Sequence, residues 1–189
     1  YGDDRRTEIQ DVEDEIDIED LIEEEQCVFT LSHAGYIKRV PASTYRAQRR
    51  GGRGVTGQSL REEDFVESVF SASTHDYLLF FTNAGRVHRR KGYQIPEAGR
   101  TARGTNIINI LPLEQGEKVT AGITVHDLEE DNLMFVTRQG TVKRLELSCL
   151  NTARKAGIRA LTLGEGDELI AVLKTTGNDN ILLATAHGM

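Results

Sequence analysis

The sequence of 189 residues has no tryptophan, three prolines and two cysteines. Cys27 and Cys149 have no CxxC neighbour, which excludes a disulfide framework and a cysteine-based metal site. We predict that both are buried small hydrophobes. The longest apolar runs, such as residues 77–81, are far too short to cross a bilayer, and no basic and apolar leader opens the chain. We therefore expect a cytoplasmic protein without membrane contact.

The residue groupings that catalysis needs are also missing. The five histidines are scattered, and no pair has metal-ligand spacing. We expect no catalytic residue, no metal site and no cofactor in this region, and a solvated surface position for His88. Residues 52–57 match the GxGxxG dinucleotide motif, but basic and polar residues precede them where that motif needs a buried strand.

Charge is abundant but divided along the chain. Residues 1–26 hold 13 of the 30 Asp and Glu residues and only two of the 23 Lys and Arg residues. The other 163 residues keep 17 acidic and 21 basic side chains, so the net charge of −7 hides a mildly basic body. This asymmetry indicates an acidic linker followed by a domain with a separate role.

Four stretches of the sequence repeat one pattern. They are FTLSHAGYIKR (29–39), LFFTNAGRVHRR (79–90), MFVTRQGTVKR (134–144) and LLATAHGM (182–189). In each, a Ser or Thr precedes a glycine by three residues. A second glycine (Gly54, Gly104, Gly157) follows 19, 19 and 17 residues after the first, and an acidic turn then leads into an apolar run. We call each repeat a unit, giving three units and the start of a fourth.

The repeated pattern is typical of β-structure. Apolar runs rich in Val, Ile, Phe and Thr flank polar turns that end in Gly, as in β-hairpins. A repeat of about 50 residues with several strands has the size of a propeller blade, and such blades stack to bury their faces. The sequence predicts an all-β, propeller-like β-pinwheel of three blades plus the start of a fourth, after an acidic linker. Because the fourth unit stops within its hairpin, we expect a longer natural chain.

Basic residues collect at one phase of the repeat. Segments 36–54, 86–103 and 138–159 hold 18 of the 21 basic residues beyond position 26, but only two acids, Glu97 and Glu146. In stacked blades, equal phase means equal position, so a continuous positive edge suited to double-stranded DNA is expected. No aromatic platform or recognition helix is evident, which favours sequence-independent binding to the backbone. The predicted contacts are Lys38, Arg39, Arg46, Arg86, Arg89, Arg90, Lys91, Arg100, Arg103, Arg138, Lys143, Arg144, Arg154, Lys155 and Arg159, together with the heptapeptide described next.

The densest part of this edge is QRRGGRG, which consists of Gln48, Arg49, Arg50, Gly51, Gly52, Arg53 and Gly54. The arginines bring charge, and the glycines let the backbone approach phosphates. This heptapeptide matches the gyrase-A box, the motif that separates bacterial DNA gyrases from topoisomerase IV. The chain resembles the C-terminal domain of DNA gyrase A over nearly its whole length, including residues 17–22, 62–65, 109–114 and 166–170.

The resemblance implies a six-bladed pinwheel whose basic rim wraps DNA, with the box required for wrapping. Gyrase then introduces negative supercoils by using ATP that gyrase B hydrolyses. The chain would be a non-catalytic part of a type IIA topoisomerase, with ATP and Mg²⁺ used elsewhere in an A2B2 heterotetramer that contains a dimer of gyrase A. Residues 1–26 would end the helix of the breakage-reunion domain and form the acidic linker, and residues 27–189 would form a partial pinwheel.

Two other functions fit parts of the same pattern. One is a C-terminal domain of the topoisomerase IV type, which binds DNA but wraps it little; the intact box argues against it. The other is a protein-binding propeller whose basic edge recognises an acidic partner, such as the acidic segment of its own chain. In that case the acidic segment would compete with DNA.

Overall fold

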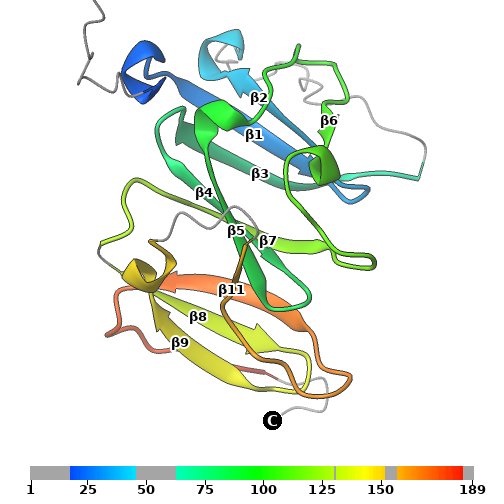
Figure 1. The fold of residues 1–189 in the computed structure, drawn as a ribbon, viewed down its shortest axis with the longest axis vertical. Coiled ribbons are helices and arrows are strands. Elements are labelled where there is room, and N and C mark those ends of the chain that lie inside the picture. The colour runs from blue at the N-terminus through cyan, green and yellow to red at the C-terminus, as the bar shows by residue number, and fades with distance from the viewer. Residues whose placement is uncertain (1–17, 46–62, 130, 152–156, 185–189) are drawn as a thin grey trace, which may run out of the picture.

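The computed structural model describes residues 18–45, 63–129, 131–151 and 157–184. Its strands form three antiparallel sheets, which follow one another along the long axis in chain order (Figure 1). The predicted all-β class and the pinwheel-like arrangement of repeated units are therefore confirmed. In the described residues, no helix is both long and apolar enough for a membrane span.

Each sheet is built around one hairpin of the sequence repeat. Sheet 1 has the order β3-β1-β2-β6, sheet 2 the order β10-β5-β4-β7, and sheet 3 the order β11-β8-β9. The first strands are β1 (Gln26–Ser32), β4 (Tyr77–Thr82) and β8 (Asn132–Thr137), and the second strands are β2 (Tyr36–Pro41), β5 (Arg86–Lys91) and β9 (Val142–Glu146). The third strands are β3 (Val66–Ser73), β7 (Val119–Val125) and β11 (Leu169–Thr175).

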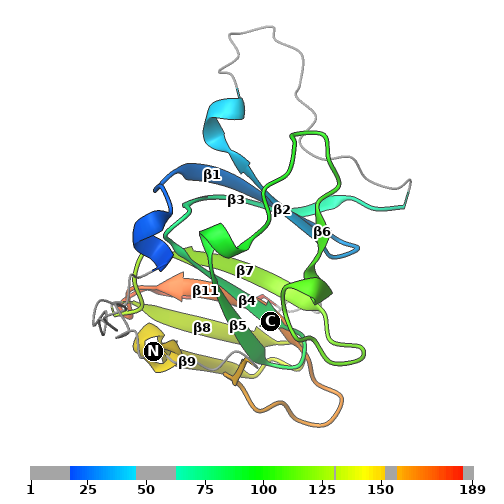
Figure 2. The same ribbon diagram turned by 45° about the horizontal axis from the view of Figure 1, so that its top comes forward.

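Two short strands cross from one unit into the sheet of the unit before. β6 (Thr105–Asn106) belongs to the second unit in sequence, but it pairs with β2, with Asn106 opposite Tyr36. β10 (Ile158–Arg159) belongs to the third unit and pairs with β5, with Arg159 opposite Arg86. Figure 2 shows β6 beside β2. The outer edge of each of these two sheets is thus completed by the next unit.

The hairpin turns explain the Ser/Thr and Gly markers of the repeat. Gly35, Gly85 and Gly140 have φ values of 84°, 75° and 86°, a left-handed conformation that favours glycine. The hydroxyl oxygen three residues earlier accepts the amide that follows each glycine, for example Ser32 Oγ from Tyr36 N at 3.1 Å. Sequence, turn and strand pairing therefore repeat together.

The apolar core lies between the sheets, and β4 supplies both of its halves. Leu78 and Phe80 pack into the cluster shared with sheet 1, whereas Leu79 and Phe81 pack into the cluster shared with sheet 3. Successive side chains of a strand point to opposite faces, so the middle sheet needs a continuous apolar run. β7 contacts both β3 and β11, which brings the three third strands next to one another.

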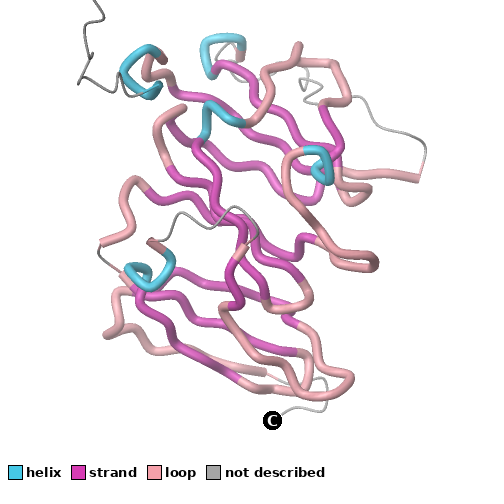
Figure 3. Tube along the Cα trace, viewed as in Figure 1, coloured by secondary structure: helices cyan, strands magenta, loops and turns pink. Residues whose placement is uncertain are grey.

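One short 3-10 turn precedes β1 and four others follow strands (Figure 3). They are η1 (Ile18–Leu21), η2 (Ala42–Thr44), η3 (Gly92–Gln94), η4 (Ile107–Asn109) and η5 (Leu147–Leu150). η5 buries Leu147 and Leu150, which lie three residues apart on one side of the turn. Cys149 lies between them and is exposed, so the prediction that both cysteines are buried is wrong for Cys149 and confirmed for Cys27.

Candidate nucleic-acid interface

The loop 96–104 brings two predicted contacts, Arg100 and Arg103, to the surface beside β2. It precedes β6 and is bonded to β2 through the backbone: Arg39 N donates to Pro96 O at 3.1 Å, and Ala98 N donates to Arg39 O at 3.0 Å. Arg100 and Arg103 are both exposed. The Arg103 guanidinium lies 5.3 Å from the centre of the Tyr36 ring, a cation–π contact.

This loop is the described counterpart of the gyrase-A box. Residues 98–104 occupy the same place before the second glycine of their unit as residues 48–54, and Arg100 and Arg103 correspond to Arg50 and Arg53. The box itself, together with Arg46, Arg154 and Lys155, lies outside the described residues. The loop 96–104 is therefore the one box-like segment whose backbone and contacts can be followed in the described part of the chain.

The repeat predicts Lys38 as a surface contact, but the structure places it in the interior. Its exposed fraction is 0%. Its Nζ donates to the carbonyl oxygens of Gly99 (2.9 Å), Ala102 (2.9 Å) and Arg100. Burial lowers the pKa of this ammonium from its ordinary value. Lys38 thus lies under the loop that carries the exposed arginines.

Arg39, the next residue of β2, is held by protein groups. Its Nε donates to Ile95 O at 3.1 Å, and its Nη1 lies 3.5 Å from Glu97 Oε2. Glu97 is one of the two acids found in the basic segments, and the pair accounts for its presence there. Arg39 is half-buried, with side-chain contacts to Ile95 and to Glu97 at the start of the loop 96–104.

In the second unit, Arg86 and Arg90 also make structural contacts. Arg86 pairs with the carboxylates of Glu114 and Glu117, the latter at 3.5 Å. Arg90 donates to Ile110 O from both Nε (3.2 Å) and Nη2 (2.8 Å), and burial lowers its pKa. These two cations connect β5 to the segment between β6 and β7.

Arg89 and Lys91 both make cation–π contacts with the ring of Tyr77. Their charged groups lie 5.2 and 3.9 Å from the ring centre, respectively. Arg89 also donates to Asn151 Oδ1 at 3.1 Å. Lys91 Nζ donates to Glu19 Oε1 at 3.1 Å and to His75 O at 2.8 Å. The acidic segment before β1 therefore contacts one of the predicted DNA-binding cations.

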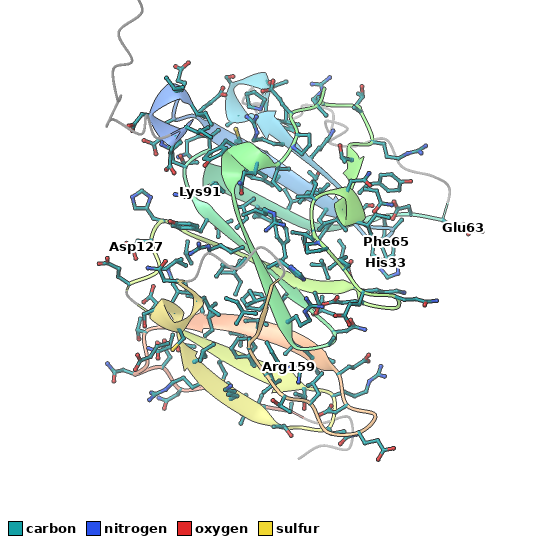
Figure 4. All side chains as sticks on the ribbon, in the orientation of Figure 1. His33, Glu63, Phe65, Lys91, Asp127 and Arg159 are labelled. Carbon is teal, nitrogen blue, oxygen red and sulfur yellow. The ribbon has the colours of Figure 1, made fainter. Side chains whose placement is uncertain are left out.

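Among the described residues, the third unit has the largest number of exposed cations. Arg138, Lys143, Arg144 and Arg159 are all exposed. Arg138 pairs with Glu168 at 2.7 Å, and Lys143 Nζ donates to Ala160 O at 2.7 Å. Figure 4 labels Lys91 and Arg159, which come from the second and third units, so the predicted contacts extend over more than one unit. Both residues lie in sheet 2, because β10 pairs with β5.

His88 has a different environment from the one expected. It occupies the register of Lys38 and Lys143, but it is fully buried, so the prediction of a solvated side chain is wrong. Neither ring nitrogen has a hydrogen-bond partner among the described residues. Burial lowers its pKa, and the nearby Arg86 and Arg90 charges act in the same direction against the opposing effect of Glu117. The ring is therefore neutral near pH 7 and lies directly against Gly157.

Sequence reasoning missed the role of three acids at the opposite phase of the repeat. The carboxylates of Asp64, Glu117 and Asp167 accept hydrogen bonds from Ser32, Thr82 and Thr137, respectively. Desolvation opposes ionisation of Asp64, Glu117 and Asp167, but these hydrogen bonds and nearby amide donors lower each pKa below its ordinary value. The sequence did contain a signal for these hydrogen bonds, because an acid recurs in the acidic turn that follows each Ser/Thr marker.

Other features of the described residues are a cavity and a stacked aromatic pair. A cavity of about 660 Å³ lies among the hairpin turns, and its charged lining includes Glu67, Glu117, Lys118 and Glu168. His33 and Phe65 stack at 4.7 Å near it, on the opposite side of the molecule from Lys91 (Figure 4). In the residues that the structure describes, no cluster of His, Cys, Asp and Glu could hold a metal ion.

Comparison with known families gives a match to all three units. The family described as "DNA gyrase C-terminal domain, beta-propeller" matches residues 28–73, 76–126 and 131–176. The DNA gyrase A protein of Clostridium acetobutylicum is 48% identical over 190 residues, which cover 100% of this chain and 23% of that protein. The Staphylococcus epidermidis gyrase A protein is 54% identical over 194 residues, covering 99% and 21%. The chain therefore spans less than a quarter of the length of these relatives.

Solved structures show the same fold. The crystal structure of the C-terminal domain of DNA topoisomerase IV superposes with a TM-score of 0.70 and 26% identity, covering 82% of this chain and 47% of that one. The structure of a DNA gyrase A C-terminal domain superposes with a TM-score of 0.64 and 25% identity, covering 80% and 48%. The fold is common to both types, whereas the Clostridium acetobutylicum gyrase A protein is nearly twice as similar in sequence as the topoisomerase IV domain.

Proposed function

Since this chain belongs to the DNA gyrase C-terminal domain family, we propose that it binds and wraps double-stranded DNA. The observation that carries the proposal is the loop 96–104, where Arg100 and Arg103 are exposed on a backbone that is fixed to β2. Guanidinium groups on a fixed loop suit phosphate oxygens, which they bind through charge-assisted hydrogen bonds. Contacts of this kind position a duplex without reading its sequence.

The predicted contacts among the described residues fall into three groups. Arg89 and Lys91 are half-buried beside Tyr77, and Lys91 becomes available to a phosphate only when its contact with Glu19 opens. Lys38, Arg39, Arg86 and Arg90 have donors engaged by the protein, so their main effect is on the shape of the edge. The exposed cations are the proposed phosphate contacts: Arg100, Arg103, Arg138, Lys143, Arg144 and Arg159. The box residues Arg49, Arg50 and Arg53 join them on the strength of the sequence alone.

The wider role that we propose follows from the same membership. Wrapping around the basic edge gives the DNA crossing a fixed hand, and gyrase then introduces negative supercoils with ATP that gyrase B hydrolyses. The partners would be duplex DNA, the rest of a dimeric gyrase A, and gyrase B in an A2B2 assembly in the bacterial cytoplasm. In this proposal the chain binds DNA for that reaction and supplies no catalytic group to it.

A salt titration of binding to duplex DNA tests the first step. If about 8 phosphates are contacted, the plot of log K against log salt concentration should have a slope near −7. A slope near zero would contradict DNA binding and favour a propeller that recognises an acidic protein. Lys118→Ala should leave the slope unchanged, because Lys118 is exposed but lies outside the basic segments.

Supercoiling by the reconstituted enzyme tests the second step. Replacing Arg49, Arg50 and Arg53 with Ala should abolish negative supercoiling but leave DNA cleavage and ATP-dependent relaxation intact. Unchanged supercoiling would refute the role of the box. An unmutated enzyme that relaxes DNA and never supercoils it would instead place the domain with the topoisomerase IV type.

A further inference from the structure

The three acceptors around Lys38 match the hydrogen-bonding capacity of its side chain. An ammonium group has three N–H donors and no acceptor, and the carbonyls of Gly99, Arg100 and Ala102 take one donor each. No carboxylate of the described residues lies within ion-pair distance of Lys38. A buried charge is stable only where its donors are satisfied, so this arrangement requires the loop to keep its present backbone path.

All three acceptors lie in the loop that carries the exposed arginines. The backbone oxygen of Arg100 accepts a hydrogen bond from Lys38, while the side chain of Arg100 is exposed to solvent. Ala102 precedes Arg103, which rests on Tyr36 of the same strand as Lys38. The next residue, Gly104, has a φ of 92° and lies directly against Ile37 and Lys38. One strand of the first sheet, β2, thus fixes both arginines of the loop 96–104.

We infer that Lys38 is a positioning residue for DNA binding: it does not touch DNA, but it fixes the backbone that presents Arg100 and Arg103 as a pair of phosphate contacts. This inference rests on the proposed function. A donor that is fixed before binding loses less conformational entropy when it contacts a phosphate. Loss of the buried ammonium frees the loop and therefore weakens both arginine contacts at once. Lys38 therefore acts through the loop, although it belongs to the preceding unit.

The repeat offers an internal comparison. At the same register, His88 is buried with a neutral ring, and Lys143 is exposed with one bond to Ala160 O. Only Lys38 of the three has three carbonyl acceptors among the described residues. We therefore assign the positioning role to Lys38 and not to His88 or Lys143.

Chemical labelling of the unmutated protein tests the burial that the inference requires. Brief acetylation of the full chain without DNA, followed by peptide mass spectrometry, should leave Lys38 unmodified while exposed Lys118 reacts. Addition of a DNA duplex should leave this protection unchanged. A direct phosphate contact would react freely without DNA and become protected only in the complex, and that result would overturn the inference. The measurement needs no variant and so does not depend on the folding of one.

A double-mutant cycle tests how Lys38 acts. Lys38→Met should reduce the magnitude of the salt slope by about 1.8, which corresponds to two phosphates, whereas a single direct contact would remove about 0.9. In the Arg100→Ala/Arg103→Ala background, Lys38→Met should cause no further loss of DNA affinity, because non-additivity marks residues that act together. Lys118→Met removes the same charge at an exposed site and should change neither quantity.

The outcomes separate this inference from the proposed function. Additive effects with a slope change of about 0.9 make Lys38 a direct contact and overturn the inference, while DNA binding stands. An Arg100→Ala/Arg103→Ala variant with unchanged affinity overturns the inference as well, because the loop then contributes no contact. A flat salt dependence of the unmutated chain removes the proposed function itself, whatever the labelling of Lys38 shows.

Discussion

His88 Nε2 lies 3.8 Å from Glu117 Oε1 at the inner side of β5, and the side chains are 0% and 2% exposed. The pKa of each is below its ordinary value. For His88 the main cause is burial. For Glu117, hydrogen bonds from Glu114 N and Thr82 and the charge of Arg86 outweigh desolvation. The carboxylate therefore carries the charge, and the imidazole beside it is neutral.

The neutral state of His88 predicts a loss of stability in mild acid. A histidine whose folded pKa lies below its unfolded value of about 6.5 favours the folded state above that pH, and this contribution is lost as pH falls toward the folded pKa. His88→Asn should therefore show a smaller drop in the free energy of unfolding between about pH 7.5 and 5.5 than the unmutated chain. Denaturant titrations at both pH values measure it.

His126 provides a control of opposite sign. A hydrogen bond with Asp76, at 2.9 Å, and the charge of that carboxylate raise the pKa of His126. Its contribution is present below about pH 6.5 and is lost as pH rises through the folded pKa. His126→Asn should make the drop toward about pH 5.5 larger. Equal pH profiles for the two variants would contradict the assignment of the neutral ring to His88.

Glu117 and Glu114 both pair with Arg86, but their exposure differs sharply, at 2% and 77%. Glu117→Ala leaves Thr82 and Arg86 without a buried partner and should destabilise the fold by about 2–4 kcal/mol. Glu114→Ala removes an exposed partner and should cost less than about 1 kcal/mol. Chemical denaturation at neutral pH compares them. Similar losses would show that the buried carboxylate has no special role.

Gly104 and Gly99 lie in the same loop but differ in what a side chain would meet. At Gly104, φ is 92° and a Cβ would come within 2.5 Å of Ile37 O, whereas nothing lies within 4 Å at Gly99. Gly104→Ala should lower stability by at least about 1–3 kcal/mol, since a left-handed conformation disfavours alanine and β6 must shift. Gly99→Ala should be near neutral. Thermal unfolding distinguishes them, and equal melting temperatures would contradict the close packing of Gly104.

The contact between Glu19 and Lys91 allows a test of the hypothesis that the acidic segment competes with DNA. Glu19→Gln removes the carboxylate 3.1 Å from Lys91 Nζ and should raise DNA affinity at low salt, by up to about fivefold for a partly exposed ion pair. Glu23→Gln removes the same charge at an exposed position and serves as the control. Filter binding or fluorescence anisotropy measures the effect. An equal gain in both variants would mean that net charge, and not this contact, is responsible.

The fold was largely predictable because its determinants are local. The Ser/Thr and Gly markers fix hairpin turns through their own hydrogen bonds, and the alternation in β2 sets which side chains face inward. The pairing of β6 with β2 was not predictable in the same way. β6 has two residues and no periodicity, and its partner lies about 70 residues earlier in the chain.

The positions of the cations in the repeat were predicted from the sequence, but the burial of their side chains was not. The alternation in β2 correctly puts Lys38 on the face opposite Ile37, but the next unit lays the loop 96–104 over that face and buries it. Arg86 and Arg90 likewise meet acceptors far along the chain, at Glu117 and Ile110. A count of cations in sequence cannot separate these side chains from exposed Arg100 and Arg103, because the distinction arises only from contacts between units.

Because β6 and β10 each pair with the sheet of the preceding unit, they also determine when each sheet can be completed during synthesis. The first sheet starts at Gln26 and cannot be completed until Asn106 has been made, and the second starts at Tyr77 and must wait for Arg159. At about 5–20 residues per second, synthesis from the first to the last residue of each sheet takes roughly 4–16 s, and the outer edge of the sheet stays unpaired until the end of that time. The two intervals overlap, so the nascent chain always has one sheet open while the preceding one closes.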